Sequence, residues 1–180
     1  MTIDHTTTPI GRQIAVADRL ALHTFIAEKA RETEIEVGFG WVGTAEAPST
    51  YQQLRGAYAH SQATGDPLPV SNEHCESTIY VLRSDNMAFR YWHDVSHVRQ
   101  GLSFRLEDEL ELAMWHLSQI EQVGYDESSS VYRLFEFDLV GQIFLMGLIG
   151  RFPLDQGAFV GVCNQQGMLG GLLHEIRRVS

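Results

Sequence analysis

The chain has few basic residues, few cysteines and no long apolar run. It has 13 Lys and Arg residues and 23 Asp and Glu residues, which gives a net charge of −10. Such a charge opposes approach to a phosphate backbone or an anionic lipid surface, so nucleic-acid binding is not expected. No window approaches the roughly 18 uncharged apolar residues that a membrane helix needs. We therefore expect no membrane span.

The two cysteines argue against a cysteine-based metal site, and the first residues argue against a signal peptide. Cys75 and Cys163 are far apart and match neither a CxxC pair nor a zinc-ribbon spacing, so two reduced, buried thiols are expected. Residues 1–10 are polar and rich in threonine, and they lack the basic and apolar regions of a signal peptide. The sequence therefore predicts a disordered tail at 1–10 on a cytoplasmic protein.

Length and composition predict one domain. The chain has 180 residues, of which 44% are hydrophobic, and this is ordinary for a globular protein with a sizeable core. We assign residues 11–180 to a single globular domain.

The residue pattern predicts a mainly α fold (α+β) with a small two-stranded β element. Helical periodicity indicates helices at about 11–32, 50–63, 85–100, 105–123, 131–149 and 165–179. Alternating apolar residues at 34–41 and a β-branched run at 77–82 indicate the two strands. The link between the third and fourth helices, near 101–104, is short. It predicts a central αα-hairpin with the two helices packed side by side and antiparallel.

The strongest chemical signal lies on these two central helices. His93 and His97 are four residues apart and share a helix face, while Glu109 and His116 fall on one stripe of the next helix. Counted outward from the link at about 1.5 Å per residue, His97 is level with Glu109, and His93 is within about a turn of His116. The spacing thus permits one cluster of all four side chains.

Imidazole nitrogen and carboxylate oxygen together suit zinc, divalent iron or manganese, and zinc is the ion we expect first. A simpler interpretation stays open. The histidines can be hydrogen-bonded core residues, and the acidic run 107–111 can complement the dipole at a helix N-terminus.

Asp94 follows the first histidine, as an acid does in the H-E-x-x-H helix of metalloproteases, where it activates a water on the metal. It is therefore the candidate catalytic residue. Asp is one methylene shorter than Glu, and the later zinc ligands of those enzymes are missing. An ion pair with Arg90 or a hydrogen bond to a ligating histidine are the alternative roles.

Asp138 and Gln142 form a second polar pair, on the apolar helix at 131–149. They project from nearly the opposite side to Arg133 and Glu136, so one of the two sides faces inward. A buried Asp must be hydrogen-bonded, paired or near a cation. We treat Asp138 and Gln142 as candidate accessory ligands.

Several of these motifs together resemble a loosely defined group of phage and mobile-element proteins. The motifs are Phe89-Arg-x-x-His-Asp-x-x-His, Gly101-x-x-Phe104, Glu109 with His116 seven residues later, Asp138-x-x-Gly-Gln142 and Phe152-Pro-x-Asp-Gln156. The resemblance covers about the second half of the chain, and the group has no settled activity. It implies that His93, Asp94, His97, Glu109 and His116 act together at a metal.

Two functions follow as hypotheses. The first is a small metal-dependent enzyme, a hydrolase acting on a small-molecule substrate, in which the ion turns a bound water into a nucleophile. The second is a non-catalytic accessory protein of a phage or mobile element, such as an anti-defence or protein-binding factor, with a structural metal or polar cluster. Iron redox chemistry of the helical-bundle type is disfavoured, because its E-x-x-H motifs are missing.

Overall fold

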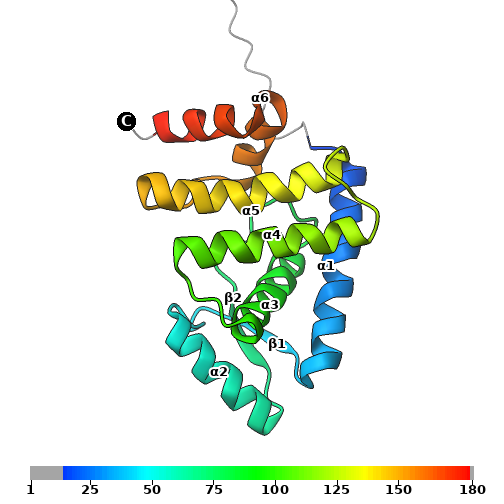
Figure 1. Cartoon of the computed structure of the whole chain (residues 1–180), viewed down its shortest axis with the longest axis vertical. Coiled ribbons are helices and arrows are strands. Elements are labelled where there is room, and N and C mark those ends of the chain that lie inside the picture. Colours follow the sequence, from blue (N-terminus) through cyan, green and yellow to red (C-terminus); the bar gives the residue numbers. More distant parts are fainter. Residues whose placement is uncertain (1–13, 179–180) are drawn as a thin grey trace, which may run out of the picture.

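The computed structural model describes residues 14–178, which form six helices and two short strands (Figure 1). In chain order these are α1 (Val16–Val37), β1 (Trp41–Thr44), α2 (Tyr51–Thr64), β2 (Leu68–Ser71), α3 (Arg83–Gln100), α4 (Leu106–Gln122), α5 (Ser130–Ile149) and α6 (Gln156–Arg177). The predicted fold class, mainly α with a small two-stranded β element, is confirmed. The predicted tail at 1–10 lies outside the described residues.

Side-chain caps fix where several helices begin. Thr50 accepts a hydrogen bond from the backbone N–H of Gln53 at the start of α2, and the Gln53 side chain returns the contact as a capping box. Ser129 caps α5 by accepting from Tyr132, and Asp155 caps α6 by accepting from Ala158. These polar residues satisfy backbone N–H groups that have no partner within their own helix.

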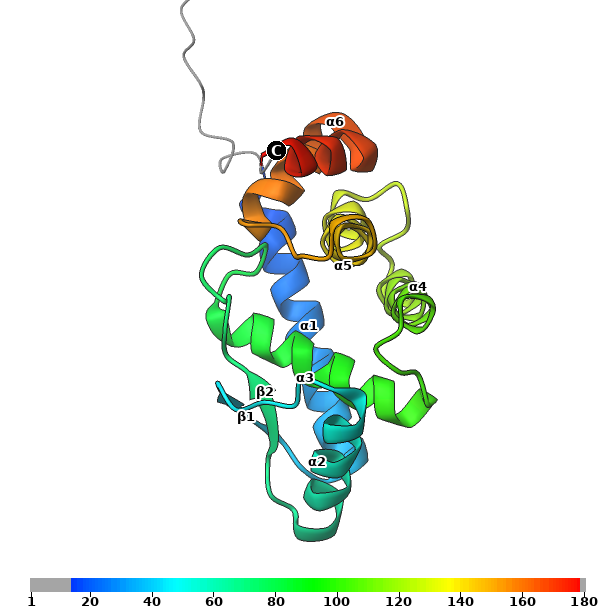
Figure 2. The same cartoon turned by 90° about the vertical axis from the view of Figure 1, so that its left-hand side faces the viewer.

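The helices pack as layers around a shared core. Figures 1 and 2 show α5 between α4 and α6, while α3 packs mainly against α1. The core between them contains large, fully buried side chains, including Leu22, Ile26, Tyr91, Phe135 and Phe159. Within residues 14–178, no helix has the length and apolar character required to span a bilayer.

The two strands do not lie where the sequence predicts them. Residues 34–37 continue α1, with Ile35 69% exposed, because this helix runs on until Gly38 ends it with a φ of 83°. At 77–82 the chain bends, and the Arg19 side chain donates to the backbone oxygens of Ile79 and Tyr80. Those carbonyls are thus satisfied without a neighbouring strand.

The two strands that do form are parallel, and α2 connects them in the sequence. Trp41 pairs with Leu68 and Thr44 with Ser71, so the unit is β1–α2–β2. Pro69 lies within β2, which a two-stranded sheet tolerates because both strands are edges.

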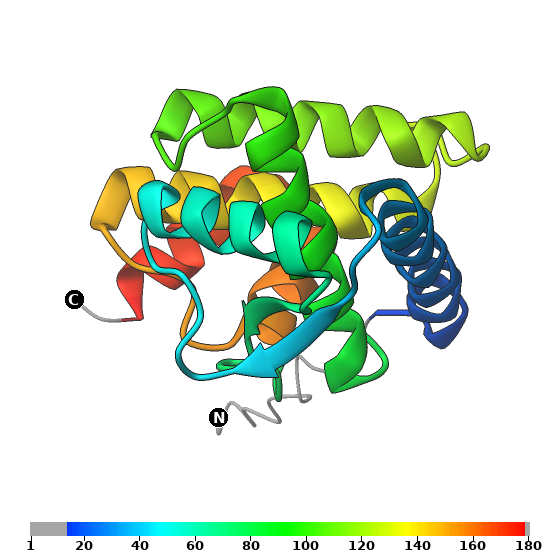
Figure 3. The same cartoon turned by 90° about the horizontal axis from the view of Figure 1, so that it is seen from below.

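The two central helices also differ from the predicted hairpin geometry. α3 and α4 are joined by the short link 101–105, but Figures 2 and 3 show them crossing steeply and not running side by side. Each instead packs along a different neighbour, α3 on α1 and α4 on α5. Their closest approach includes the region where the predicted histidine and glutamate side chains lie.

Candidate metal centre

Three of the predicted ligands converge where α3 meets α4. His93 and His97 project from α3 and Glu109 from the first turn of α4, and one ligand atom from each lies within 4.8 Å of the others. The Nε2 atoms of the two histidines are 2.9 Å apart. Glu109 places Oε2 at 3.5 Å from His93 Nε2 and Oε1 at 3.4 Å from His97 Nε2.

These separations match the edges of a metal coordination polyhedron. Zinc–nitrogen and zinc–oxygen bonds of about 2.0–2.2 Å in a tetrahedral site place neighbouring ligand atoms roughly 3.3–3.5 Å apart. The two distances from Glu109, each to a different carboxylate oxygen, lie within that range, and the 2.9 Å between the two imidazole Nε2 atoms is shorter than it. A single divalent ion therefore fits among His93, His97 and Glu109 with little movement of the side chains.

The carbonyl of Leu102 fixes the proton on His97. His97 Nδ1 lies 3.0 Å from the Leu102 backbone oxygen, and a carbonyl can only accept, so this nitrogen carries the hydrogen. In neutral His97 the Nε2 lone pair then faces His93 and Glu109. Metal-binding histidines typically donate their second ring N–H in this way, which orients the ring and selects the tautomer.

His116 lies behind His93 and not beside the other ligand atoms. Its Nε2 is 3.1 Å from His93 Nδ1, whereas the ligand group is made by His93 Nε2, His97 and Glu109. The predicted four-ligand cluster therefore takes the form of three ligands and one supporting histidine. When His93 presents a lone pair at Nε2, its Nδ1–H has His116 as acceptor, which parallels the role of Leu102 for His97.

Aromatic rings enclose His116 completely. Its side chain is fully buried, and its ring centroid lies 4.1 Å from that of Trp92, 5.0 Å from Trp115 and 5.6 Å from Phe89. Burial, with the nearby His93 and His97, lowers the pKa of His116 well below its usual value. His116 is therefore a neutral imidazole at pH 7. Its Nδ1 is a buried nitrogen without a hydrogen-bond partner among the described residues.

The carboxylate of Glu109 is held in its charged form. Burial alone would raise its pKa, but hydrogen bonds with His93 and His97 and the charges on those rings lower the pKa to about 2. Its side chain is 24% exposed, that of His93 is 20% exposed, and that of His97 is inaccessible. Solvent thus reaches the group from the Glu109 and His93 side.

Asp94 is half-buried beside these residues, and burial raises its pKa to about 6 against the lowering effects of His93 and Arg90. The alternative ion pair with Arg90 is not formed. Arg90 instead donates to the backbone oxygens of Ser71 and Glu73, at 2.7 and 2.8 Å. The Asp94 carboxylate makes no hydrogen bond or ion pair with the other residues in 14–178. Its predicted catalytic role stays a prediction.

Asp138 belongs to a separate network. It is fully buried, as its position on the helix predicts, and it accepts hydrogen bonds from Gln156 and, at 3.4 Å, from the Tyr80 hydroxyl. The Gln142 side chain donates to the Asp138 backbone oxygen at 3.0 Å. Neither residue is part of the His93–His97–Glu109 group. Their predicted role as accessory ligands has no support in this geometry.

Several supporting groups have no clear sequence signal. The backbone carbonyl of Leu102 has no residue-specific signal in the sequence, because every residue has such a carbonyl. Trp92 and Trp115 each directly precede a histidine, but adjacent residues on a helix point about 100° apart, so sequence proximity alone does not predict that both rings enclose His116.

Comparisons with known proteins add nothing to this description. No family model matches the chain, and searches of curated proteins and of solved structures gave no match either.

Proposed function

We propose that this protein binds one divalent metal ion, zinc in the first instance, and uses it as a small metal-dependent hydrolase. The observation that carries the proposal is the convergence of His93 Nε2, His97 Nε2 and the Glu109 carboxylate at 2.9–3.5 Å. Both imidazoles also have an acceptor for their second ring nitrogen, which is the arrangement of metal sites more than of isolated core histidines.

The number of protein ligands favours a catalytic over a purely structural ion. Structural zinc sites are closed by four protein ligands, whereas two histidines and one glutamate leave a position for water or substrate. A bound ion of this kind supplies Lewis-acid activation of water. Glu109 and His93 are partly exposed, so that position is on the side that solvent reaches. Iron and manganese accept the same ligands and are the alternative ions.

Asp94 is the candidate base in this proposal. Its carboxylate follows His93 on α3, is partly accessible, and is not engaged by Arg90, which binds Ser71 and Glu73. It is therefore free to accept a proton from a water near the ion. The substrate is a small molecule not specified by this geometry.

Metal analysis tests the binding step. The untagged protein, purified without chelator, is expected to contain close to one equivalent of metal. The double variant His93→Ala plus His97→Ala is expected to contain none. His60→Ala is the matched control, because His60 is an exposed histidine on α2 that pairs with Asp66. A wild-type protein that holds no metal after zinc loading and dialysis would refute the proposal.

Hydrolysis is tested separately with zinc-loaded protein and a panel of chromogenic esters, amides and phosphodiesters. Asp94→Asn is expected to keep the metal and lose turnover. Full metal occupancy without turnover of any substrate would reject the enzyme and leave a metal-binding protein.

A second candidate function is a non-catalytic accessory protein of the phage or mobile-element type. The observation that favours it is the low exposure of the cluster, since His97 and His116 are both inaccessible. In that case the polar group serves to hold the crossing helices α3 and α4 together. Chelation would then lower thermal stability, and Asp94→Asn would change nothing measurable.

A further inference from the structure

A cleft of about 490 Å³ is lined by residues of α1, α3 and α4, among them Trp92 and Trp115, whose rings also contact His116. Its volume is within the range of small-molecule sites. Trp92 and Val95 are buried apolar side chains of its lining, and Trp115 is partly exposed there. The lining therefore includes an aromatic surface on which a flat ring can stack.

The charges that line the cleft cancel. Lys29 pairs with Glu32 at 3.0 Å, and Arg99 pairs with Glu36. Two cations and two carboxylates give no net charge, in a chain whose total is −10. The cleft thus has no excess of positive charge to attract a phosphate or carboxylate.

The uncharged polar groups of the cleft include both acceptors and donors. Ser96 donates its hydroxyl hydrogen to the Trp92 backbone oxygen at 2.7 Å, and Thr33 donates to the Lys29 backbone oxygen at 2.7 Å, so their own oxygens keep lone pairs. The amides of Gln100 and Gln119 each add an acceptor oxygen and N–H donors. A ligand that satisfies them carries N–H donors and acceptor atoms on its edge.

We propose that this cleft binds a flat, uncharged heteroaromatic molecule with N–H donors, of the nucleobase or nucleoside class. Stacking on Trp115 provides the part of the affinity that does not depend on which base is bound. Hydrogen bonds from the hydroxyl and amide groups to the edge of the ring provide the part that does. This site is distinct from the metal centre and does not depend on a bound ion.

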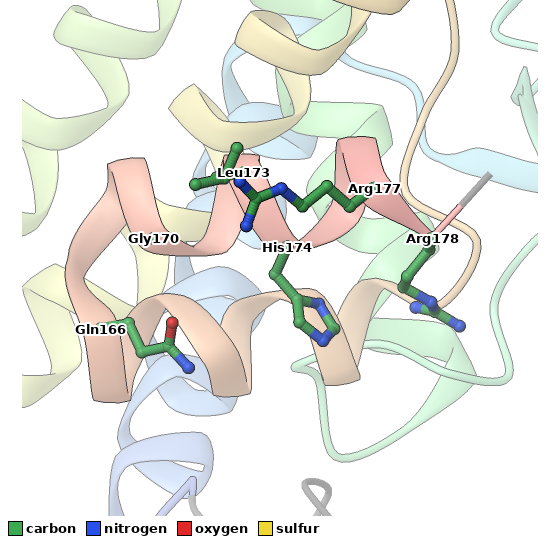
Figure 4. Close-up of a pocket in the computed structure, with 6 residues that line it drawn as sticks. All are labelled: Gln166, Gly170, Leu173, His174, Arg177 and Arg178. Carbon is green, nitrogen blue, oxygen red and sulfur yellow. The ribbon is translucent and has the colours of Figure 1, made fainter. Parts of the chain in front are cut away.

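A second hollow among the described residues does not support an alternative anion site. It measures about 310 Å³ and is lined by Gln166, His174, Arg177 and Arg178 among others. Figure 4 shows the Arg177, His174 and Arg178 side chains spread apart and not converging on one point. Arg178 also pairs with the buried Glu175, and Arg177 and Arg178 lie at the C-terminal end of α6, where their charges complement the helix dipole.

The three tryptophans allow a direct test. In ¹⁵N-labelled protein the indole N–H signals of Trp41, Trp92 and Trp115 are followed by NMR while adenosine is added. Trp41 lies on β1, outside the cleft. We expect saturable shifts at Trp92 and Trp115 and none at Trp41. Ribose should shift none of them, and adenosine 5′-monophosphate should bind no more tightly than adenosine.

Variants identify the site. Trp115→Leu is expected to weaken adenosine binding by about tenfold or more, through loss of the stacking surface, whereas Trp41→Leu should leave it unchanged. If Trp115→Leu fails to fold, Gln100→Trp replaces an exposed lining residue and should block the cleft without disturbing the core.

Three outcomes would overturn the proposal. One is the absence of indole shifts with adenosine, guanosine and cytidine up to about 10 mM, which corresponds to almost no useful affinity. Another is binding that survives both Trp115→Leu and Gln100→Trp. The third is a monophosphate that binds far more tightly than its nucleoside, which would make the cleft an anion site.

Discussion

In the proposed metal site, His116 supports a ligand and is not a ligand itself. When His93 presents a lone pair at Nε2, His116 Nε2 accepts a hydrogen bond from His93 Nδ1, 3.1 Å away, and the His116 ring packs against Trp92 and Trp115. We expect His116→Phe, which keeps the ring volume but removes the hydrogen bond, to lower zinc affinity roughly 10- to 100-fold. Competition with a chromophoric chelator measures this change.

Packing and hydrogen bonding can be separated at the same position. His116→Gln retains a polar group and should recover part of the affinity that His116→Phe loses. Thermal unfolding of both metal-free variants reports their packing. Zinc affinity equal to wild type in His116→Phe would show that His93 needs no partner at Nδ1.

Asp138 makes stability depend on pH. Burial raises its pKa to about 7, against the lowering effect of hydrogen bonds from Gln156 and Tyr80, whereas an unfolded Asp titrates near 3.9. Between these values the folded protein holds a proton that the unfolded chain has released. The free energy of unfolding therefore falls as pH rises from about 4 to about 7, by on the order of 4 kcal/mol, and this contribution is constant above that.

Asp138→Asn should remove this contribution. The expected result is a smaller decrease in the free energy of unfolding between pH 5 and 7 than in the wild type, measured by urea denaturation at each pH. The comparison is the difference between the two proteins, because other groups titrate equally in both. Parallel pH profiles would contradict the raised pKa.

At the level of helices, replacement of glycine by alanine is expected to have opposite effects on stability at two positions. A Cβ at Gly171 in α6 would lie 2.1 Å from Cys163 Sγ, so Gly171→Ala is expected to destabilise by about 1–3 kcal/mol through overpacking. A Cβ at Gly56, in the exposed middle of α2, meets nothing within 4 Å. Gly56→Ala should stabilise by roughly 0.5–1 kcal/mol.

Chemical denaturation of both variants measures these changes, with Gly56→Ala as the matched control for the general effect of replacing glycine in a helix. Gly167, with a φ of 76°, interrupts α6 between Cys163 and Gly171. A stabilised Gly171→Ala would show that Gly171 does not pack against Cys163 across this interruption.

Most helices were predictable because their signals are local. The capping residues Thr50 and Ser129 and the terminator Gly101 lie where the pattern indicates. The predicted strand positions were wrong for two reasons. The alternating pattern at 34–41 is overridden by the continuation of α1, and the pairing of β1 with β2 depends on residues 27 positions apart. Such long-range pairing leaves little trace in either segment.

For the whole molecule, the proposed metal binding predicts a linked change in folding stability. An ion that binds only the folded chain raises the free energy of unfolding by about 2.7 kcal/mol at a free concentration 100 times its Kd. For a domain of this size we expect the Tm to rise by roughly 5–10 °C with zinc. Chelator should reverse the rise, and His60→Ala should behave as the wild type.

The double variant His93→Ala plus His97→Ala should show no zinc-dependent change in Tm. A rise of equal size in this variant would place the stabilising ion elsewhere, for example at exposed carboxylates of this acidic chain. Differential scanning calorimetry at fixed protein concentration distinguishes these results.

The sequence by itself determined which residues share a helix face, because an α-helix has a fixed period. It thereby brought His93 next to His97 and put Asp138 and Gln142 on one side of a helix, nearly opposite Arg133 and Glu136. Only the tertiary structure decided how α3 crosses α4, since that angle follows from the packing of α3 on α1 and of α4 on α5. The crossing brings Glu109 to the two histidines, and it places His116 against the far nitrogen of His93, outside the group of ligand atoms. Periodicity orders side chains along one helix, but the packing of several helices sets the distances between them.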